Sequence, residues 1–152
     1  MSSVEQFAAM GNALENLPSP FREALSQRIS TQERVRHLVH SPVFATDKFR
    51  YLASVLCVTD MQWFIVLSQK DGSATINQSS YDRTLFVELT IILLHGQLRI
   101  DFVLDGKARS AACQFNTVME RAYVKAIQDI LNAIDGNGQP GEKLQWLGYS
   151  RD

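Results

Sequence analysis

An alternation of apolar and polar side chains from Thr84 to Leu104 limits the possible folds more than any other feature of the sequence. Apolar residues occupy every odd position in the first half of this segment and every even position in the second: Leu85, Val87, Leu89, Ile91, Leu93, Leu98, Ile100, Phe102 and Leu104. Successive side chains of a β-strand point to opposite faces of a sheet. The alternation therefore predicts two antiparallel strands that share one buried face.

The dipeptide His95-Gly96 separates the two predicted strands. Glycine supplies the positive φ that tight two-residue hairpin turns require, so we expect the turn at this dipeptide. Such a turn would pair Leu93 with Leu98 and Leu89 with Phe102, which leaves apolar residues on both sides of each pair. A slip of one residue would bury the polar residues of the second strand instead, because it moves every side chain to the other face.

A second hairpin turn is predicted at Asp105-Gly106, a dipeptide that is typical of tight turns. It would place Ile100 opposite Ala111 and Leu98 opposite Cys113. The small side chains of Ala111 and Cys113 leave room above the sheet for a bulky group. We expect the helix that follows to fill this space.

The C-terminal helix is predicted to begin at Thr117 and to end near Asp135-Gly136. Thr117 and Glu120 have the spacing of a capping box, and a glycine just past the last turn is a common helix end. Apolar residues recur between these limits at helical spacing: Met119, Ala122, Tyr123, Ala126, Ile127, Ile130, Ala133 and Ile134. This stripe predicts that one side of the helix packs on the sheet.

The part of the chain before Thr84 is predicted to contain two helices and four short strands. The helices are expected at 3–17 and 20–30, with Ser19 as the N-cap of the second and Pro20 in its first turn. The strands, a turn and a polar loop follow in the order 33–40, 51–58, 63–68, turn 69–72, 73–77 and loop 78–82.

Composition favours a single soluble domain in the cytoplasm. The chain has 152 residues, of which 45% are hydrophobic and 20% charged, and its net charge is −1. Dispersed charge argues against nucleic-acid binding, and the start of the sequence does not resemble a secretion signal. No apolar stretch is long enough to predict a transmembrane segment. Cys57 and Cys113 lie in apolar runs without nearby partners, which predicts buried thiols rather than metal ligands.

The sequence suggests three regions: a helical pair at 1–32, the sheet and C-terminal helix at 33–135, and a linker with an apolar tail at 136–152. The tail contains Trp146, Leu147 and Tyr149 after a segment rich in glycine and proline. It is expected either to fold back on its own domain or to bind another chain, and the sequence leaves both possibilities open.

Several short phrases resemble those of bacterial pleckstrin-homology-like domains. They are Glu33-Arg34-Val35 at the start of a first strand, Val55 to Asp60 before Trp63 to Val66, and Phe115 ahead of the last helix. The resemblance covers roughly residues 33–135. It implies an α+β fold, namely an antiparallel split barrel capped by the C-terminal helix, and a role in binding a protein or a lipid head group.

Some members of that family bind phosphoinositides through basic residues beside the first loop between strands. The resemblance carries this role to Arg36, Lys48 and Arg50. The loop departs from the family pattern because it has few other cations and contains the acidic Asp47. Ordinary solvated charge is the competing interpretation of these three residues.

No motif in the sequence predicts catalysis, a metal or a cofactor. His37, His40 and His95 lack the partners and spacing of a metal or catalytic site. Asp101 and Glu88 fall on the outward face of the predicted hairpin, where a carboxylate pair is conceivable but solvated charge is the simpler explanation.

The sequence therefore predicts a non-catalytic interaction module that binds a protein partner or self-associates. Two alternatives remain open at this point. One is peripheral binding of anionic lipid head groups, and the other is a small-ligand enzyme whose site the sequence does not reveal.

Overall fold

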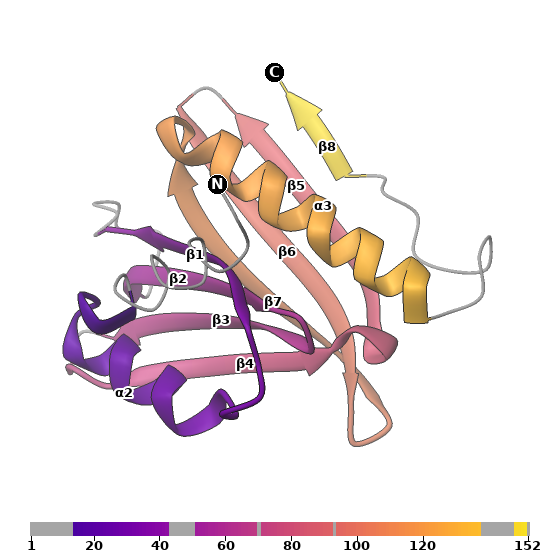
Figure 1. Ribbon diagram of the computed structural model, residues 1–152. Coiled ribbons are helices and arrows are strands. Elements are labelled where there is room, and N and C mark those ends of the chain that lie inside the picture. Colours follow the sequence, from indigo (N-terminus) through magenta and orange to yellow (C-terminus); the bar gives the residue numbers. More distant parts are fainter. Residues whose placement is uncertain (1–13, 43–50, 70, 93, 138–147, 152) are drawn as a thin grey trace. The chain divides into compact units, whose positions relative to one another are not determined.

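The computed structural model describes residues 14–42, 51–69, 71–92, 94–137 and 148–151. Its contacts divide the chain into two compact units, Met1–Gln78 and Ser79–Asp152. Helices and two four-stranded sheets make up these units, so the fold is α+β (Figure 1). The predicted helix at 3–17 lies outside the described residues except for its last residues.

The first sheet has the strand order β1-β2-β3-β4. The bounds are Val35–Ser41 for β1, Tyr51–Thr59 for β2, Gln62–Gln69 for β3 and Ala74–Ser80 for β4. β2 pairs antiparallel with both β1 and β3. These strands match the predicted ones closely, although β4 continues to Ser80 and is therefore longer than expected.

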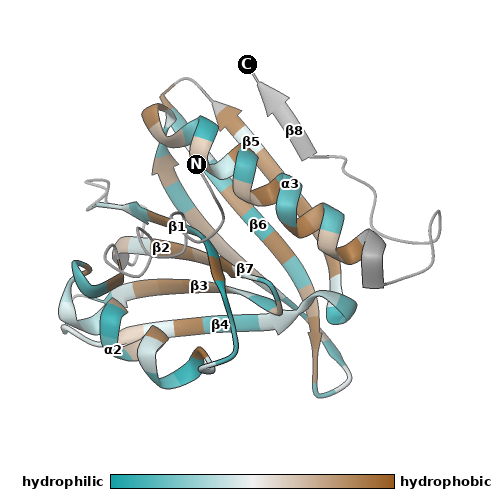
Figure 2. Ribbon diagram, in the orientation of Figure 1, coloured by the Kyte–Doolittle hydropathy of each residue, from teal (hydrophilic) through white to brown (hydrophobic). Residues whose placement is uncertain are grey.

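Helix α2, Ser19–Arg28, packs on one face of this sheet through Phe21 and Leu25. The residues of the shared core alternate along the strands, as the period-two pattern requires: Val35, Ala53, Val55, Cys57, Phe64 and Val66. In the ribbon of Figure 2, the apolar residues of α2 and of the strands are coloured brown. The N-cap is Pro18 rather than Ser19, because the helix already begins at Ser19. The Ser19 hydroxyl donates to the Glu23 carboxylate 3.1 Å away, and no side chain accepts a backbone N–H as a cap.

The polar loop predicted at 78–82 is wrong. Strand β4 runs to Ser80, and Tyr81–Arg83 forms a short 3-10 helix, η1. The Tyr81 side chain is buried, and the Thr84 hydroxyl donates to the Ser80 carbonyl at 3.0 Å. The Ser79 and Thr84 hydroxyls thus both donate to the Ser80 backbone carbonyl, which composition alone does not reveal.

The second sheet has the order β7-β6-β5-β8, with β5 at Thr84–Ile92, β6 at His95–Leu104, β7 at Lys107–Asn116 and β8 at Gly148–Arg151. The predicted turn at Asp105-Gly106 is confirmed, since φ is 54° at Asp105 and 76° at Gly106. The predicted pairs across it are also confirmed: Ile100 with Ala111 and Leu98 with Cys113.

The predicted turn at His95-Gly96 is wrong. β5 ends at Ile92, which pairs with His95, and Leu89 pairs with Leu98 rather than with Phe102. The partner of Leu89 has therefore moved by four residues. A change of register by an even number of residues keeps each side chain on the same face of the sheet. The core-facing residues Leu98, Ile100 and Phe102 of β6 are therefore buried as expected.

The position of Gly96 inside β6 has a steric cause. A Cβ atom at Gly96 would lie 2.3 Å from the ring of Phe115 on the neighbouring strand. Phe115 in turn stacks on Tyr123 of the C-terminal helix, with ring centroids 4.0 Å apart and an interplanar angle of 12°. Gly96 therefore makes space for an aromatic ring, and its backbone is not in the left-handed conformation of a turn.

Two of the described residues of the alternating pattern are not in the core. Leu85 is 47% exposed and Leu104 is 40% exposed. The pairing of β5 with β6 shifts between Thr84 and Phe86, and Thr84 is buried in place of Leu85. Leu104 directly precedes the turn at Asp105-Gly106, beyond the part of the sheet that is covered.

The C-terminal helix α3, Glu120–Asn137, follows a 3-10 turn, η2, at Thr117–Met119. Its buried stripe confirms the predicted helical spacing: Tyr123, Ala126, Ile127, Ile130 and Ile134. The predicted capping box at Thr117 is wrong, because the Asn116 side chain accepts the Val118 N–H at 3.0 Å and caps the turn. In Figure 1, α3 crosses the face of β5 and β6.

We predict that Gly96→Ala lowers the free energy of unfolding by about 3 kcal/mol, at the upper end of the cost of overpacking, because the new methyl group overlaps a ring that Tyr123 prevents from moving. Gly106→Ala is the matched control. Gly106 has a positive φ but open space around its Cβ position, so its substitution should cost only about 1–2 kcal/mol, the strain of a left-handed alanine. Denaturant unfolding of both variants measures the difference, and equal losses would contradict the packing role of Gly96.

We also predict that stability rises with pH as His40 loses its proton. Burial beside the ring of Phe21, 5.5 Å away, lowers the pKa of His40 below 6.5. The unfolded chain therefore binds the proton more readily, so stability is fully present above pH 6.5 and falls as the pH drops towards the lowered pKa. His40→Gln should flatten this part of the profile in thermal melts, and an unchanged slope would contradict the assignment.

Candidate functional site

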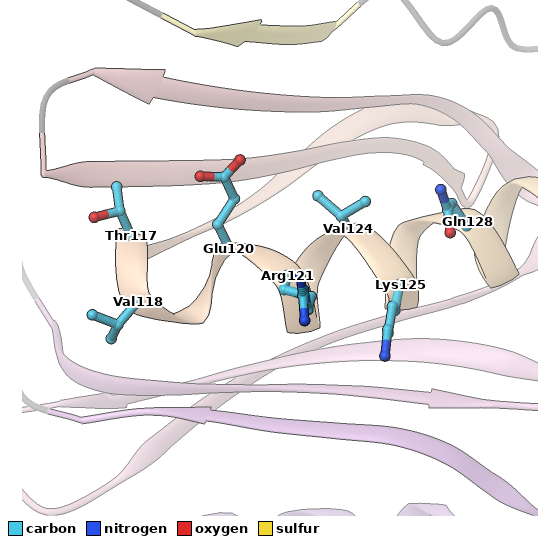
Figure 3. Close-up of a pocket in the computed structure, with 7 residues that line it drawn as sticks. All are labelled: Thr117, Val118, Glu120, Arg121, Val124, Lys125 and Gln128. Carbon is cyan, nitrogen blue, oxygen red and sulfur yellow. The ribbon is translucent and has the colours of Figure 1, made fainter.

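A shallow hollow lies on the surface of α3 at its N-terminal end (Figure 3). Its volume is about 570 Å³, and the residues that line it come from η2 and the first turns of α3: Thr117, Val118, Glu120, Arg121, Val124, Lys125 and Gln128. We refer to these residues as the α3 surface. They lie away from the stripe that anchors the helix to its sheet.

The spacing of three residues explains how the helix builds this surface. Val118, Arg121 and Lys125 follow one another at intervals of three and four, so they project from the same side. Figure 3 shows Arg121 and Lys125 pointing in the same direction. Val118 is 83% exposed, which is unusual for a branched apolar side chain. An exposed apolar residue therefore stands beside two cations.

Neither Arg121 nor Lys125 forms an ion pair within the part of the chain that the structure describes. Arg99 on β6 shows the contrasting case. Its guanidinium lies 3.7 Å from the Glu88 carboxylate, 3.4 Å from that of Asp101 and 5.2 Å from the ring centre of Phe86. The positive charge of the α3 surface is available to a ligand, whereas that of Arg99 is neutralised within its own sheet.

The position of Arg99 also determines the role of the Glu88 and Asp101 carboxylates. The two carboxylates share one guanidinium, and Asp101 accepts a further hydrogen bond from the Ser110 hydroxyl. They therefore form an ion-pair network on the sheet rather than the carboxylate pair considered from the sequence.

A buried carboxylate, Glu33, was missed by the sequence analysis. It is 4% exposed, and it accepts hydrogen bonds from the Thr59 hydroxyl, the Gln62 side-chain amide and the Ser30 backbone N–H. The Thr59 hydroxyl also accepts the backbone N–H groups of Met61 and Gln62 at 3.1 Å each. Ser30 and Glu33 have the spacing of a capping box, which was the available sequence signal.

This network continues to the surface. The side-chain amide of Gln78 donates to the side-chain oxygen Oε1 of Gln62. The Arg28 guanidinium donates to Oε1 of Gln78, and each of these distances is 3.1 Å. Glu33 therefore joins the start of β1 to the turn between β2 and β3. The hydrogen bonds of the Glu33 carboxylate thus hold these two parts of the first unit together.

Cys57 is placed as a buried thiol. Burial, followed by the negative charge of Glu33, raises the pKa of Cys57 far above its ordinary value. The protonated thiol is a weak nucleophile and a poor metal ligand. Cys113 is also a buried thiol and forms no disulfide, so both cysteines are buried as predicted.

The residues predicted to bind lipid or a partner are only partly described. Arg36 is exposed on β1, beside the register shift between Val35 and His37, while Lys48 and Arg50 lie outside the described residues. Trp146 and Leu147 also lie outside them. Tyr149 belongs to β8, whose backbone pairs in parallel with β5 of the same chain. The end of the tail thus folds back on its own sheet.

The described histidines occur on two strands. His37 and His40 lie on β1, and His95 begins β6. Among the residues the structure describes, no group of three or more His, Cys, Asp or Glu side chains could hold a metal ion. No described helix is both long enough and apolar enough to cross a membrane.

Comparison with known proteins identifies a similar fold but no family. No protein-family profile and no curated protein matches the chain. A solved structure, the hSac2 domain from the human phosphoinositide phosphatase Sac2, aligns with a TM-score of 0.56 at 7% sequence identity. The alignment covers 86% of this chain and 85% of that one. The likeness extends over most of both chains and shows a shared arrangement of the backbone.

We predict that Glu33→Gln lowers the free energy of unfolding by about 1–3 kcal/mol, since an amide N–H would face groups that are themselves donors. Glu23→Gln on the exposed side of α2 is the matched control and should change stability by less than about 0.5 kcal/mol. Denaturant unfolding measures both variants. Equal stability of Glu33→Gln and the wild type would contradict the network.

Proposed function

We propose that this chain is a non-catalytic interaction module of the cytoplasm that binds an acidic segment of a protein partner on the α3 surface. One observation carries the proposal: exposed Val118 stands beside Arg121 and Lys125, two cations without ion-pair partners among the described residues. A segment with apolar and acidic side chains complements this surface.

Energetic considerations favour a partner that supplies both kinds of side chain. Covering Val118 would contribute about 1.5 kcal/mol through removal of apolar surface from water. An exposed ion pair contributes about 0–1 kcal/mol, but it strengthens once a partner excludes water around it. Charge would thus speed and orient the encounter, while the apolar contact would slow dissociation.

The use of the chain's other reactive groups supports a binding role. Glu33 is held by structural hydrogen bonds, Glu88 and Asp101 pair with Arg99, and Cys57 is a buried thiol. Catalytic groups in an active site usually face a cleft with a shifted pKa. Among the described residues, none of these four groups has the setting of a catalytic group.

We further propose that the two sheets and the C-terminal helix form a pleckstrin-homology-like split barrel. The antiparallel pairing of β1 to β3 and of β5 to β7, and the buried stripe of α3 that follows them, support this assignment. Domains of this architecture serve as scaffolds for binding sites, although the fold alone does not determine the ligand.

Binding of an anionic lipid head group by Arg36, Lys48 and Arg50 is the second candidate function. Arg36 is exposed, and the domain with the similar fold comes from a phosphoinositide phosphatase. Co-sedimentation with vesicles that contain phosphatidylinositol phosphates tests it. Salt-sensitive binding that Arg36→Glu weakens would support this candidate, and an absence of binding would remove it.

The main proposal predicts that reversing the charges of Arg121 and Lys125 (R121E/K125E) weakens binding of an amphipathic Glu- and Leu-containing peptide at least about tenfold. The loss arises because attraction becomes repulsion at two positions. Fluorescence anisotropy with labelled peptide measures the affinity.

Lys107→Glu with Arg109→Glu is the matched control, since both residues are exposed on β7 and the change in net charge is the same. This control should reduce affinity by less than about twofold at physiological salt, where distant charges are screened. Equal losses in the two double variants would show non-specific attraction and would overturn the proposal. Circular dichroism confirms that each variant is folded.

A further inference from the structure

The two most exposed large apolar side chains among the described residues lie on neighbouring segments at one end of the second unit. Leu94, in the turn between β5 and β6, is 67% exposed, and Val118, in η2, is 83% exposed. The residue before Val118 joins the two segments, because the Thr117 N–H donates to the Leu94 carbonyl oxygen at 3.2 Å. We refer to Leu94 and Val118 as the anchor patch.

Two hydrogen bonds and one ring stack hold the anchor patch in place. The bond to the Leu94 carbonyl ties the turn to η2, and the Asn116 side chain accepts the Val118 N–H at 3.0 Å. Directly before this cap, Phe115 stacks on Tyr123 of α3. Exposed apolar side chains on adjoining segments are typical of an interaction site, and a backbone already fixed loses little entropy on binding.

Positive charge lies on the α3 side of the anchor patch. Arg121 and Lys125 project from the same side of the helix, while Glu120 points to the other side (Figure 3). Seven residues separate Val118 from Lys125, which corresponds to about 11 Å along a helix. The surface is therefore apolar at one end and cationic at the other.

We propose that the anchor patch is the apolar end of the binding site on the α3 surface, and that it receives a bulky apolar residue of the acidic partner segment. This inference rests on the function proposed above. It adds the order of the partner's side chains, with an apolar anchor over Leu94 and Val118 and acidic residues over Arg121 and Lys125.

Charge favours an acidic segment over a second copy of the chain as the occupant. A two-fold interface joins the same surface twice, so two copies that met at the anchor patch would bring their Arg121 and Lys125 side chains towards each other. Like charges that face each other oppose association. An acidic segment turns this repulsion into attraction and covers the same apolar side chains.

Three labelled peptides of one composition, built from leucine and glutamate, probe the predicted order. In two of them the leucines form one block and the glutamates another, in opposite orders, and in the third the two residue types alternate. We expect at least one block peptide to bind the full chain at least about fivefold more tightly than the alternating peptide does, as measured by fluorescence anisotropy.

Serine substitutions test the anchor patch itself. Leu94→Ser and Val118→Ser should each weaken binding of the preferred block peptide about tenfold, because less apolar surface is removed from water. Leu104→Ser is the matched control, since Leu104 is another exposed leucine of the same unit, and it should change the affinity by less than about twofold. Circular dichroism confirms that each variant is folded.

A double-mutant cycle tests whether the anchor patch contacts the leucine block. The effect of Leu94→Ser should disappear when the leucines of the peptide are replaced by serine, because the two changes remove one contact. It should persist when the glutamates are replaced by glutamine. Equal effects of Leu94→Ser on both altered peptides would contradict the predicted order of side chains.

The serine variants and R121E/K125E separate this inference from the function on which it rests. Weaker binding in R121E/K125E with wild-type binding in both Leu94→Ser and Val118→Ser would overturn the anchor patch and leave the proposed function standing. The reverse result would remove the acidic segment and with it both proposals.

Two further outcomes would identify a different occupant and would also overturn the inference. One is a dimer in solution that Leu94→Ser dissociates. The other is binding to phosphatidylserine vesicles that Leu94→Ser abolishes, with none of the three peptides bound.

Discussion

The stack of Phe115 between Gly96 and Tyr123 is the contact on which the second unit depends. Phe115 lies on β7, Gly96 on β6 and Tyr123 on α3, so one aromatic ring fixes the distance between two strands and the helix. Because a side chain at position 96 would occupy the volume of the ring, this contact also favours Gly96 as the residue of β6 opposite Phe115 on β7. Helix and hairpin are therefore positioned together.

The position of α3 has a direct consequence for function. Its buried stripe is held on the sheet, so the opposite side of the helix is presented to solvent in a fixed orientation. Val118, Arg121 and Lys125 lie on that exposed side. A rigid helix that carries a binding surface loses little conformational entropy when a partner binds, which makes modest contacts sufficient for specific recognition.

Local periodicity predicted most of the strands and the buried stripe of α3, because burial of one face requires a regular spacing of apolar residues. It failed where a residue had a role outside its own element. Gly96 looked like a turn residue but accommodates Phe115, and Thr117 matched a capping box while Asn116 provides the cap. In both cases the deciding partner is a geometric neighbour that the local pattern does not include.

The candidate site was harder to derive from the sequence than the fold. Arg121 and Lys125 are ordinary helix residues by pattern, and only the burial of the opposite stripe and the lack of an ion pair among the described residues distinguish them. Glu33 shows the same difficulty in reverse. Its charge suggests a surface residue, yet Thr59 and Gln62, from another part of the chain, satisfy it inside the first unit.

The central claim is that the exposed side of α3 is the surface that partners contact. The most direct measurement is a nitrogen-proton correlation NMR titration of the full chain with the amphipathic acidic peptide. We expect the amide signals of Thr117 to Gln128 to move with increasing peptide, while those of β1 around Arg36 stay in place. Shifts confined to β1, or shifts spread evenly over all exposed cations, would contradict this account.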